Sequence, residues 1–208
     1  PPDGTKVYLD DPKVVKALQF LVDLGKRGVM PTGTIEWGST PQDFLQGKTA
    51  IMWTTTGNLT NVKNNAKFEF GVTPLPAKVQ PGSPTGGGNL YIFQTKDRKR
   101  QLAALEFVKW LSSPERAAEW SIATGYIATS PAAYETEAMK KYVADFPAAL
   151  VARDQLEQAV AELSTHEEGR MLDLVNDAVA AAVTGQKTPQ QALSDAQKQA
   201  ASILQRYQ

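Results

Sequence analysis

The stretch Lys48-Thr-Ala-Ile-Met-Trp-Thr-Thr-Thr-Gly57 decides the interpretation of this chain, together with Thr85-Gly-Gly-Gly-Asn-Leu-Tyr-Ile-Phe93 further along. Each stretch joins a short apolar run, which predicts a buried β-strand, to a loop of threonines or glycines. Such loops present hydroxyl groups and backbone donors to a polar ligand, and nearby aromatic rings add an apolar face. The pattern therefore indicates ligand binding rather than catalysis.

The composition excludes several classes of protein. The 208 residues suffice for one large or two small domains, and 22 basic residues balance 22 acidic ones. This neutral balance gives no long-range attraction to nucleic acid or to anionic membranes, so no nucleic-acid partner is expected. The absence of cysteine excludes disulfides and thiolate metal sites. The chain starts without Met or a signal segment, so we expect it to be part of a longer protein.

Helical periodicity dominates the rest of the sequence, with Gly and Pro residues between the periodic segments. Three short apolar runs, at 50–53, 70–75 and 90–93, predict strands. Helices are expected near 12–25, 41–45, 59–66, 102–111, 114–124, 131–143, 156–163, 172–183 and 189–204. The sequence therefore predicts a helix-rich α/β fold with at least three short strands.

The threonine run 54–56 and the glycines 86–88 are the main candidates for ligand contact. The threonines suit a sugar or phosphate oxygen, but one of them would also serve as the N-cap of the following helix. The glycine amides could line up on an anion. However, they precede a predicted strand and lack a following Gly-Lys-Ser/Thr, so a nucleotide loop is disfavoured. A flexible surface turn remains an equal alternative.

The four tryptophans differ in their surroundings. Trp110 and Trp120 lie among aliphatic residues of two adjacent predicted helices, which favours core packing. Trp37 lies in a loop rich in Gly and Pro, and Trp53 borders the threonine run. Either could stack on a sugar ring, and the position of Trp53 favours it slightly.

No catalytic, metal or cofactor site is predicted. His166 is the only histidine, and with Glu167 and Glu168 it cannot complete a metal site, so a solvated loop is expected. There is no cysteine, no Gly-x-Ser-x-Gly motif and no second histidine to activate a serine.

Several segments follow one another along the chain in an informative order. They are Leu18-Gln-Phe-Leu-Val-Asp-Leu-Gly25, Phe44-Leu-Gln-Gly-Lys-Thr-Ala-Ile-Met52, Phe70-Gly-Val-Thr-Pro-Leu-Pro76, the glycine loop, residues 104–120, Thr124-Gly-Tyr-Ile-Ala-Thr-Ser-Pro131 and Thr184-Gly-Gln-Lys-Thr-Pro-Gln-Gln-Ala-Leu193. In this order they resemble family 1 extracellular solute-binding proteins of ABC importers. The glycerol-3-phosphate-binding branch is the most similar, and the maltose-binding proteins are more distant.

The resemblance implies a two-lobed periplasmic-binding-protein type II fold, of which this chain is the C-terminal portion. Residues 1–68 and 128–208 would belong to the C-terminal lobe, and residues 69–127 to the N-terminal lobe. The remaining N-terminal portion of the same protein would then be a partner of this chain. Its absence should leave apolar surface near residues 90–93 uncovered.

The resemblance also assigns ligand-contacting residues. Thr55 and Thr56 resemble hydroxyl-bearing contacts of the second lobe, and Gly86 and Gly87 resemble glycines whose amides meet a phosphate or sugar. Tyr126 resembles the tyrosine of the Thr-Gly-Tyr turn.

This sequence departs from the glycerol-phosphate branch at one position that bears on phosphate binding. The glycerol-phosphate branch has an arginine in the loop before the penultimate helix, where this sequence has Ser164; only a shifted loop would let Arg170 replace it. Without a bidentate arginine a phosphate ester fits less well, which favours a neutral sugar or polyol while glycerol-3-phosphate stays open.

In functional terms the resemblance implies a substrate-binding subunit, not an enzyme, that delivers a sugar, polyol or glycerol-phosphate-type solute to a membrane permease. Its location would be periplasmic, or extracellular and lipid-anchored. Two alternatives stay open. The first is a carbohydrate-active hydrolase that uses two of the scattered carboxylates. The second is a helical protein-interaction module formed by the alanine-rich residues 148–208.

Overall fold

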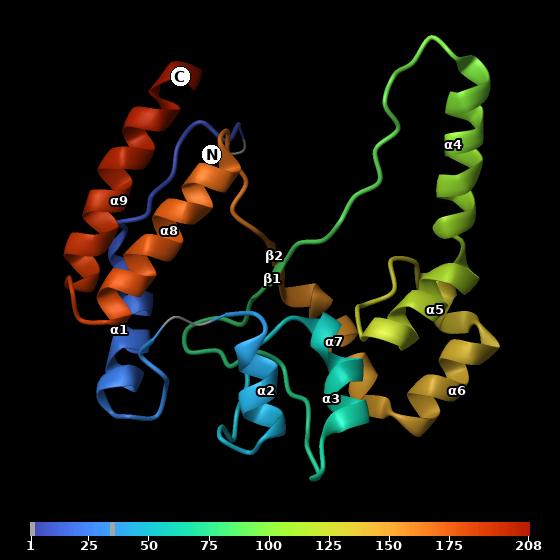
Figure 1. Ribbon diagram of the computed structural model, residues 1–208, viewed down its shortest axis with the longest axis horizontal. Helices are drawn as coiled ribbons and strands as arrows, with labels where there is room; N and C mark the ends of the chain where they lie inside the picture. The colour runs from blue at the N-terminus through green and yellow to red at the C-terminus, as the bar shows by residue number, and fades with distance from the viewer. Residues whose placement is uncertain (1–2, 34–35) are drawn as a thin grey trace. The chain divides into compact units, whose positions relative to one another are not determined.

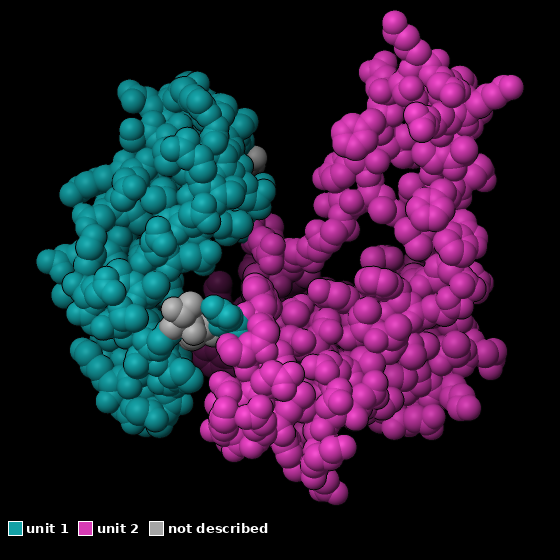
Figure 2. All heavy atoms as spheres, in the orientation of Figure 1, with its two compact units in different colours: residues 1–36, 163–208 teal, residues 37–162 magenta. Residues whose placement is uncertain are grey.

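A computed structural model describes residues 3–33 and 36–208. The chain divides into two compact units, shown in teal and magenta in Figure 2. Unit 1 consists of Pro1–Glu36 and Leu163–Gln208, and unit 2 consists of Trp37–Glu162. No helix among the described residues combines the length and the apolarity needed to cross a membrane.

Unit 1 contains the helices α1 (Pro12–Lys26), α8 (Glu168–Val183) and α9 (Pro189–Leu204), followed by the short 3₁₀ helix η5 (Gln205–Tyr207). The three long helices pack on one another, as Figure 1 shows. Their starts follow local capping rules. Asp11 accepts a hydrogen bond from the backbone N–H of Lys13 at 2.8 Å, and Thr188 and Gln191 form a capping box at the start of α9.

The core of unit 1 lies between these helices, and its most buried large side chains are Met171 and Leu204. Residues 7 and 9 of the N-terminal segment also enter this core. The Gln197 side chain holds that segment, because its Oε1 accepts from the backbone N–H of Leu9 at 2.7 Å and its Nε2 donates to the carbonyl of Val7 at 3.0 Å. The side-chain amide thus pairs with two backbone groups of a segment that has no strand partner among the described residues.

Unit 2 is built from short helices and one two-stranded sheet. Its elements are α2 (Ser39–Leu45), η1 (Thr56–Asn58), α3 (Leu59–Asn65), β1 (Ser83–Thr85), α4 (Arg98–Leu111), α5 (Pro114–Thr124), η2 (Pro131–Glu135), α6 (Glu137–Asp145), η3 (Pro147–Leu150), α7 (Val151–Asp154), η4 (Gln155–Gln158) and β2 (Ala159–Ala161). Strands β1 and β2 pair in parallel, with Ser83 opposite Ala159 and Thr85 opposite Ala161. Segments about 75 residues apart in sequence therefore meet at this sheet.

The core of unit 2 is small and surrounds α5. Ala117 and Ala118 of α5 pack with Ala133 of η2 and with Met139 of α6. Small side chains let the helix axes approach closely, and Met139, only 1% exposed, fills the remaining space. This cluster holds α5 against η2 and α6.

The predicted strands at 50–53, 70–75 and 90–93 are wrong: the sheet in the described residues is formed by 83–85 and 159–161. Ile51 is 77% exposed and Phe93 is 85% exposed, so neither apolar run is buried. A strand needs a neighbouring strand for its backbone hydrogen bonds, and these runs have none within the described chain. Apolarity alone could not show whether such a partner is present.

Three further expectations are corrected by the structure. Trp110 and Trp120 are 55% and 63% exposed, so they are not core residues. The helix predicted at 156–163 is replaced by η4 and then by β2, whose backbone groups are used in the pairing with β1. The helix predicted from 131 is divided into η2 and α6, because Thr136 provides a second N-cap.

Candidate functional site

The threonine run 54–56 leads into η1, which is followed directly by α3. Thr55 is the N-cap of η1, and its Oγ1 accepts from the backbone N–H of Gly57 at 3.4 Å. Thr54 Oγ1 accepts from Asn58 Nδ2 at 2.7 Å. Within the described residues the Thr56 hydroxyl makes no hydrogen bond. The capping interpretation therefore accounts for Thr55, while Thr56 keeps a hydroxyl group available for a ligand.

The turn that carries Tyr126 ends α5. Gly125 has φ 95°, the left-handed conformation that glycine adopts without steric cost at a helix C-terminus. Ser121 Oγ then donates to the carbonyl of Tyr126 at 2.5 Å, and the backbone N–H of Tyr126 donates to Thr124 Oγ1 at 3.1 Å. These bonds fix the backbone of Tyr126 although its side chain is 43% exposed.

The two segments meet directly. A Cβ atom placed on Gly57 would lie 2.5 Å from Tyr126 Cζ, and one on Gly125 would lie 2.7 Å from the Thr56 carbonyl oxygen. Thr60 Oγ1 also donates to the carbonyl of Ile122 at 2.9 Å, which joins α3 to α5. We call residues 54–57 and 124–126 the threonine–tyrosine junction. It unites three of the predicted ligand residues, Thr55, Thr56 and Tyr126, in one part of unit 2.

The two candidate tryptophans lie in unit 2 as well. Trp53 directly precedes the junction in sequence and is 50% exposed. Trp37 is 77% exposed, and its ring contacts no other aromatic ring within the described part of the chain. Trp53 is the nearer of the two to the junction in sequence, and ligand contact by either tryptophan stays a prediction.

The glycine loop has a neighbour that the sequence did not indicate. A Cβ atom on Gly86 would overlap the carboxylate of Glu162, which therefore lies against the open face of this glycine. The β1–β2 pairing brings the two together, and Thr85 Oγ1 reinforces it by donating to the carbonyl of Val160 at 3.2 Å. Gly87 has open space around it. Sequence reasoning missed Glu162 because only the pairing of distant strands places it here.

Arg170, the remaining predicted ligand residue, lies in unit 1 near the start of α8. Its guanidinium is 3.8 Å from Glu167 Oε2, and Glu167 also accepts hydrogen bonds from Arg206 and, at 2.8 Å, from the Tyr207 hydroxyl. Arg170 thus faces a carboxylate that two other groups already contact. The arrangement links the start of α8 to η5, which directly follows α9.

His166 is exposed, as predicted for a loop residue, but it is also ordered by its neighbours. Its ring stacks on that of Tyr207 with centroids 4.2 Å apart, and its backbone N–H donates to the carbonyl of Gly4 at 3.0 Å. Among the described residues, no group of three or more His, Asp or Glu side chains is placed to hold a metal ion.

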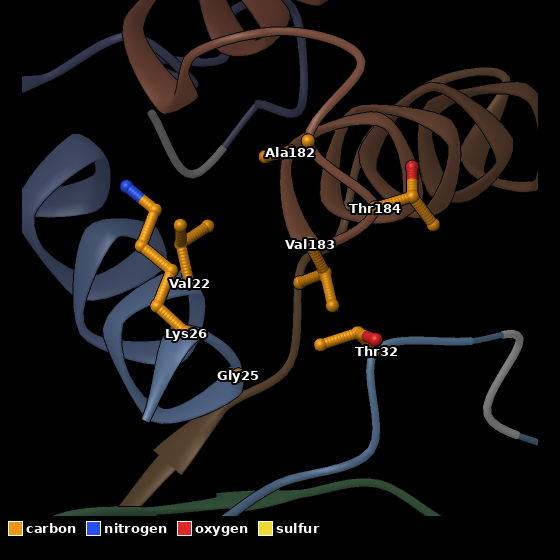
Figure 3. Close-up of a pocket in the computed structure, with 8 residues that line it drawn as sticks. Val22, Gly25, Lys26, Thr32, Ala182, Val183 and Thr184 are labelled. Atoms are coloured by element: carbon orange, nitrogen blue, oxygen red, sulfur yellow. The ribbon is translucent and has the colours of Figure 1, made fainter. Parts of the chain in front are cut away.

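Unit 1 contains a shallow hollow of about 310 Å³ between the C-terminal ends of α1 and α8. Figure 3 shows Val22 and Lys26 of α1, Val183 of α8 and Thr32 around it. None of the predicted ligand residues contributes to this hollow. Its apolar lining offers few hydrogen-bonding groups to a polar solute.

The chain matches the model of the bacterial extracellular solute-binding protein family over residues 2–148, and it belongs to that family. This membership confirms the resemblance drawn from the sequence motifs. It also confirms the expectation of a binding protein rather than an enzyme.

Among curated proteins, the chain is similar to the sn-glycerol-3-phosphate-binding periplasmic protein UgpB of Yersinia pseudotuberculosis, with 32% identity over 99% of this chain and 49% of the relative. The Salmonella typhimurium protein of the same name is 30% identical, over 99% of this chain and 50% of the relative. The chain therefore spans about half the length of the curated relatives it matches.

Solved structures confirm the predicted fold class. UgpB of Mycobacterium tuberculosis in complex with glycerophosphocholine matches with a TM-score of 0.86 at 24% identity, over 99% of this chain and 52% of that one. Maltose-bound MalE3 of T. maritima matches with a TM-score of 0.80 at 27% identity, over 95% of this chain and 52% of that one. The chain thus has the helix-rich fold of about half of a periplasmic binding protein.

Proposed function

We propose that this chain is part of the substrate-binding subunit of an ABC importer, which binds a sugar, polyol or glycerol-phosphate-type solute and delivers it to a membrane permease. In the complete protein the solute would lie in a cleft between two lobes, formed by residues 1–68 and 128–208 on one side and by residues 69–127 with the preceding N-terminal portion on the other. The complete protein would then lie in the periplasm, or it would be held at the outer cell surface by a lipid anchor.

The threonine–tyrosine junction is the observation that carries this proposal. It combines the Thr56 hydroxyl, which no group of the described chain occupies, with the partly exposed ring of Tyr126. A half-exposed indole, that of Trp53, precedes it in sequence. Hydroxyl groups beside aromatic faces suit solutes that are rich in hydroxyls and carry apolar C–H faces. The names of the relatives support the same class of ligand.

Glu162 narrows the choice of ligand. Its carboxylate lies against Gly86, one of the two glycines proposed to offer amides to the solute. A carboxylate accepts hydrogen bonds from hydroxyl groups but repels a phosphate, and Arg170, the only arginine proposed for phosphate, already faces Glu167. We therefore favour a neutral sugar or polyol over glycerol-3-phosphate.

Isothermal titration calorimetry of the longest in-frame product that contains this chain tests the proposal. The panel comprises maltose, glycerol, glycerol-3-phosphate and glycerophosphocholine. We expect at least one compound to bind, and Tyr126→Ala to weaken it by about tenfold or more, which corresponds to ~1.4 kcal/mol. Trp120→Ala is the control, because this exposed aromatic residue of α5 lies outside the junction. No binding across the panel, or equal losses in both variants, would contradict the proposal.

A further inference from the structure

Gly86 and Glu162 occupy equivalent places at one edge of the two-stranded sheet in unit 2. Gly86 directly follows β1, and Glu162 directly follows β2, which lies beside β1 in Figure 1. The strands run parallel with Thr85 opposite Ala161, so Gly86 and Glu162 hold the next positions of the same register. Opposite residues of paired strands lie side by side, and the pairing itself therefore brings the Glu162 side chain to Gly86.

The carboxylate of Glu162 lies directly against the backbone of Gly86. A Cβ atom on Gly86 would overlap Cδ and both carboxylate oxygens of Glu162, whereas a Cβ atom on Gly87 would meet nothing within 4 Å. The overlapping atoms are the end of a flexible side chain, so a methyl group at position 86 would move the carboxylate rather than the backbone. The missing side chain of Gly86 thus sets the place of the carboxylate.

The charge of Glu162 has no partner in the described ranges 3–33 and 36–208. The residue is exposed, and its carboxylate makes no hydrogen bond or ion pair there. The hydroxyl of the adjacent Thr85 donates to the carbonyl of Val160 at 3.2 Å instead. An ionised carboxylate is purely an acceptor, with two oxygens that can each take hydrogen bonds. Both oxygens are therefore open to donors of a ligand.

The chemistry of this carboxylate selects the kind of group that can bind to it. The group must donate hydrogen bonds and must not be negatively charged, which excludes a phosphate at this point of the site. Two hydroxyls on adjacent carbons of a sugar or polyol meet both conditions, because each can donate to one carboxylate oxygen. A paired contact of this kind fixes the orientation of the bound group as well as adding binding energy.

We propose that Glu162 is a specificity-determining residue, which accepts hydrogen bonds from two adjacent hydroxyls of the solute, and that Gly86 positions its carboxylate for this contact. This inference rests on the proposed function and narrows the substrate class to solutes with a free vicinal diol that faces this edge of the sheet. Gly86 then acts through its missing side chain, which is a role separate from any contact of its amide with the solute.

Isothermal titration calorimetry of the longest in-frame product that contains this chain tests the role of Glu162. The probes are the compound that binds among maltose, glycerol, glycerol-3-phosphate and glycerophosphocholine, and its derivatives in which one hydroxyl at a time is replaced by hydrogen. In the parent protein, loss of either of two adjacent hydroxyls should weaken binding by about tenfold, which is ~1.4 kcal/mol. In Glu162→Ala the same two derivatives should bind as well as the complete compound.

A charge control separates this contact from a general electrostatic effect. Glu162→Gln and Glu157→Gln remove the same charge, and Glu157 is an exposed residue of the neighbouring η4. We expect Glu162→Gln to lower the preference for the unphosphorylated member of the glycerol and glycerol-3-phosphate pair by about tenfold or more. Glu157→Gln should leave this preference unchanged.

The positioning role of Gly86 has its own readout. Gly86→Ala should weaken binding as much as Glu162→Ala does, yet leave the urea denaturation midpoint unchanged, because the methyl group displaces only a flexible side chain. In the Glu162→Ala background, Gly86→Ala should have no further effect on affinity. Gly82→Ala is the matched control at the other end of β1, where a Cβ atom meets only the Gln158 carbonyl oxygen at 4.0 Å.

The outcomes distinguish this inference from the proposed function. If the parent protein binds no compound of the panel, the proposed function fails and this inference fails with it. If the parent binds but Glu162→Ala leaves the cost of removing each hydroxyl unchanged, only the role of Glu162 is overturned. Additive losses of affinity in Gly86→Ala and Glu162→Ala would overturn the positioning role of Gly86.

Discussion

The ring of Tyr126 lies against the α-carbon of Gly57, so closely that a Cβ atom at position 57 would be 2.5 Å from Tyr126 Cζ. The two residues are far apart in sequence: Gly57 is the middle residue of η1, and Tyr126 lies two residues after the end of α5. Only glycine allows the start of η1 to approach the aromatic ring at this distance. The contact joins the hydroxyl-bearing loop to the aromatic turn and thereby defines the candidate site.

Gly57→Ala should therefore displace Tyr126. We expect a loss of about 1–3 kcal/mol in the free energy of unfolding, the usual cost of overpacking, measured by urea denaturation. Gly71→Ala serves as the control, because a Cβ atom there meets nothing within 4 Å. The double variant with Tyr126→Ala should recover most of the loss, since it removes the ring; a purely additive result would contradict the contact.

Gly125→Ala should cost more than Gly185→Ala. Both glycines have positive φ, 95° and 78°, so both variants carry the backbone cost of about 1–2 kcal/mol. At position 125 the added methyl group also meets Leu59 Cβ at 2.6 Å and the Thr56 carbonyl oxygen at 2.7 Å, whereas position 185 is open. Denaturation midpoints of the two variants measure the difference. Equal losses would show that the two segments are not in contact.

Core substitutions should distinguish the two units. Met139 of unit 2 and Met171 of unit 1 are 1% and 0% exposed, and truncation of either to Ala should cost about 2–5 kcal/mol. All four tryptophans lie within residues 37–162, so tryptophan fluorescence reports on unit 2. We expect Met139→Ala to lower the denaturation midpoint that is followed by tryptophan fluorescence. We expect Met171→Ala to lower chiefly the denaturation midpoint that is followed by far-UV circular dichroism. Identical shifts of both signals in both variants would show a single cooperative unit instead.

The ion pair at the start of α9 predicts a dependence of stability on pH. The hydrogen bond from Lys187 Nζ to Asp195 at 2.7 Å, together with the ammonium charge, holds the pKa of this carboxyl below its ordinary value of 3.8. A carboxyl with a lowered pKa in the folded state stabilises the protein above the unfolded-state pKa and loses this effect as pH falls through the folded-state pKa.

Asp195→Asn should therefore be slightly less stable than the parent chain at pH 7 and equally stable once the pH has fallen well below 3.8. The pair is exposed, so the effect is expected to be small. Denaturation midpoints from pH 7 to pH 2 measure it. Lys187→Gln should give the same pH profile of stability as Asp195→Asn. If the variants still differ in stability from the parent chain at the lowest pH, the effect is one of packing rather than of charge.

Local rules predicted most of the helices, although the helix predicted at 156–163 is replaced by η4 and β2. Each helix end depends on residues within one turn, so it can be predicted from adjacent residues alone. This holds for the N-caps Asp11, Ser113 and Thr188 and for Gly125 at the end of α5. The predicted strands failed because a strand is completed by a distant segment. The short parallel pair formed by residues 83–85 and 159–161 left no periodic pattern in either segment.

The sequence by itself determined the family, the helix-rich fold class and most helix boundaries, because these depend on ordered motifs and on short-range capping. It also named Thr55, Thr56, Gly86 and Tyr126 as candidates, whose contact with ligand stays a prediction. Only the tertiary structure joined the threonine loop to Tyr126 and placed Glu162 against Gly86. The physical reason is that both contacts depend on the packing of segments far apart in the chain, which no local pattern of residues encodes.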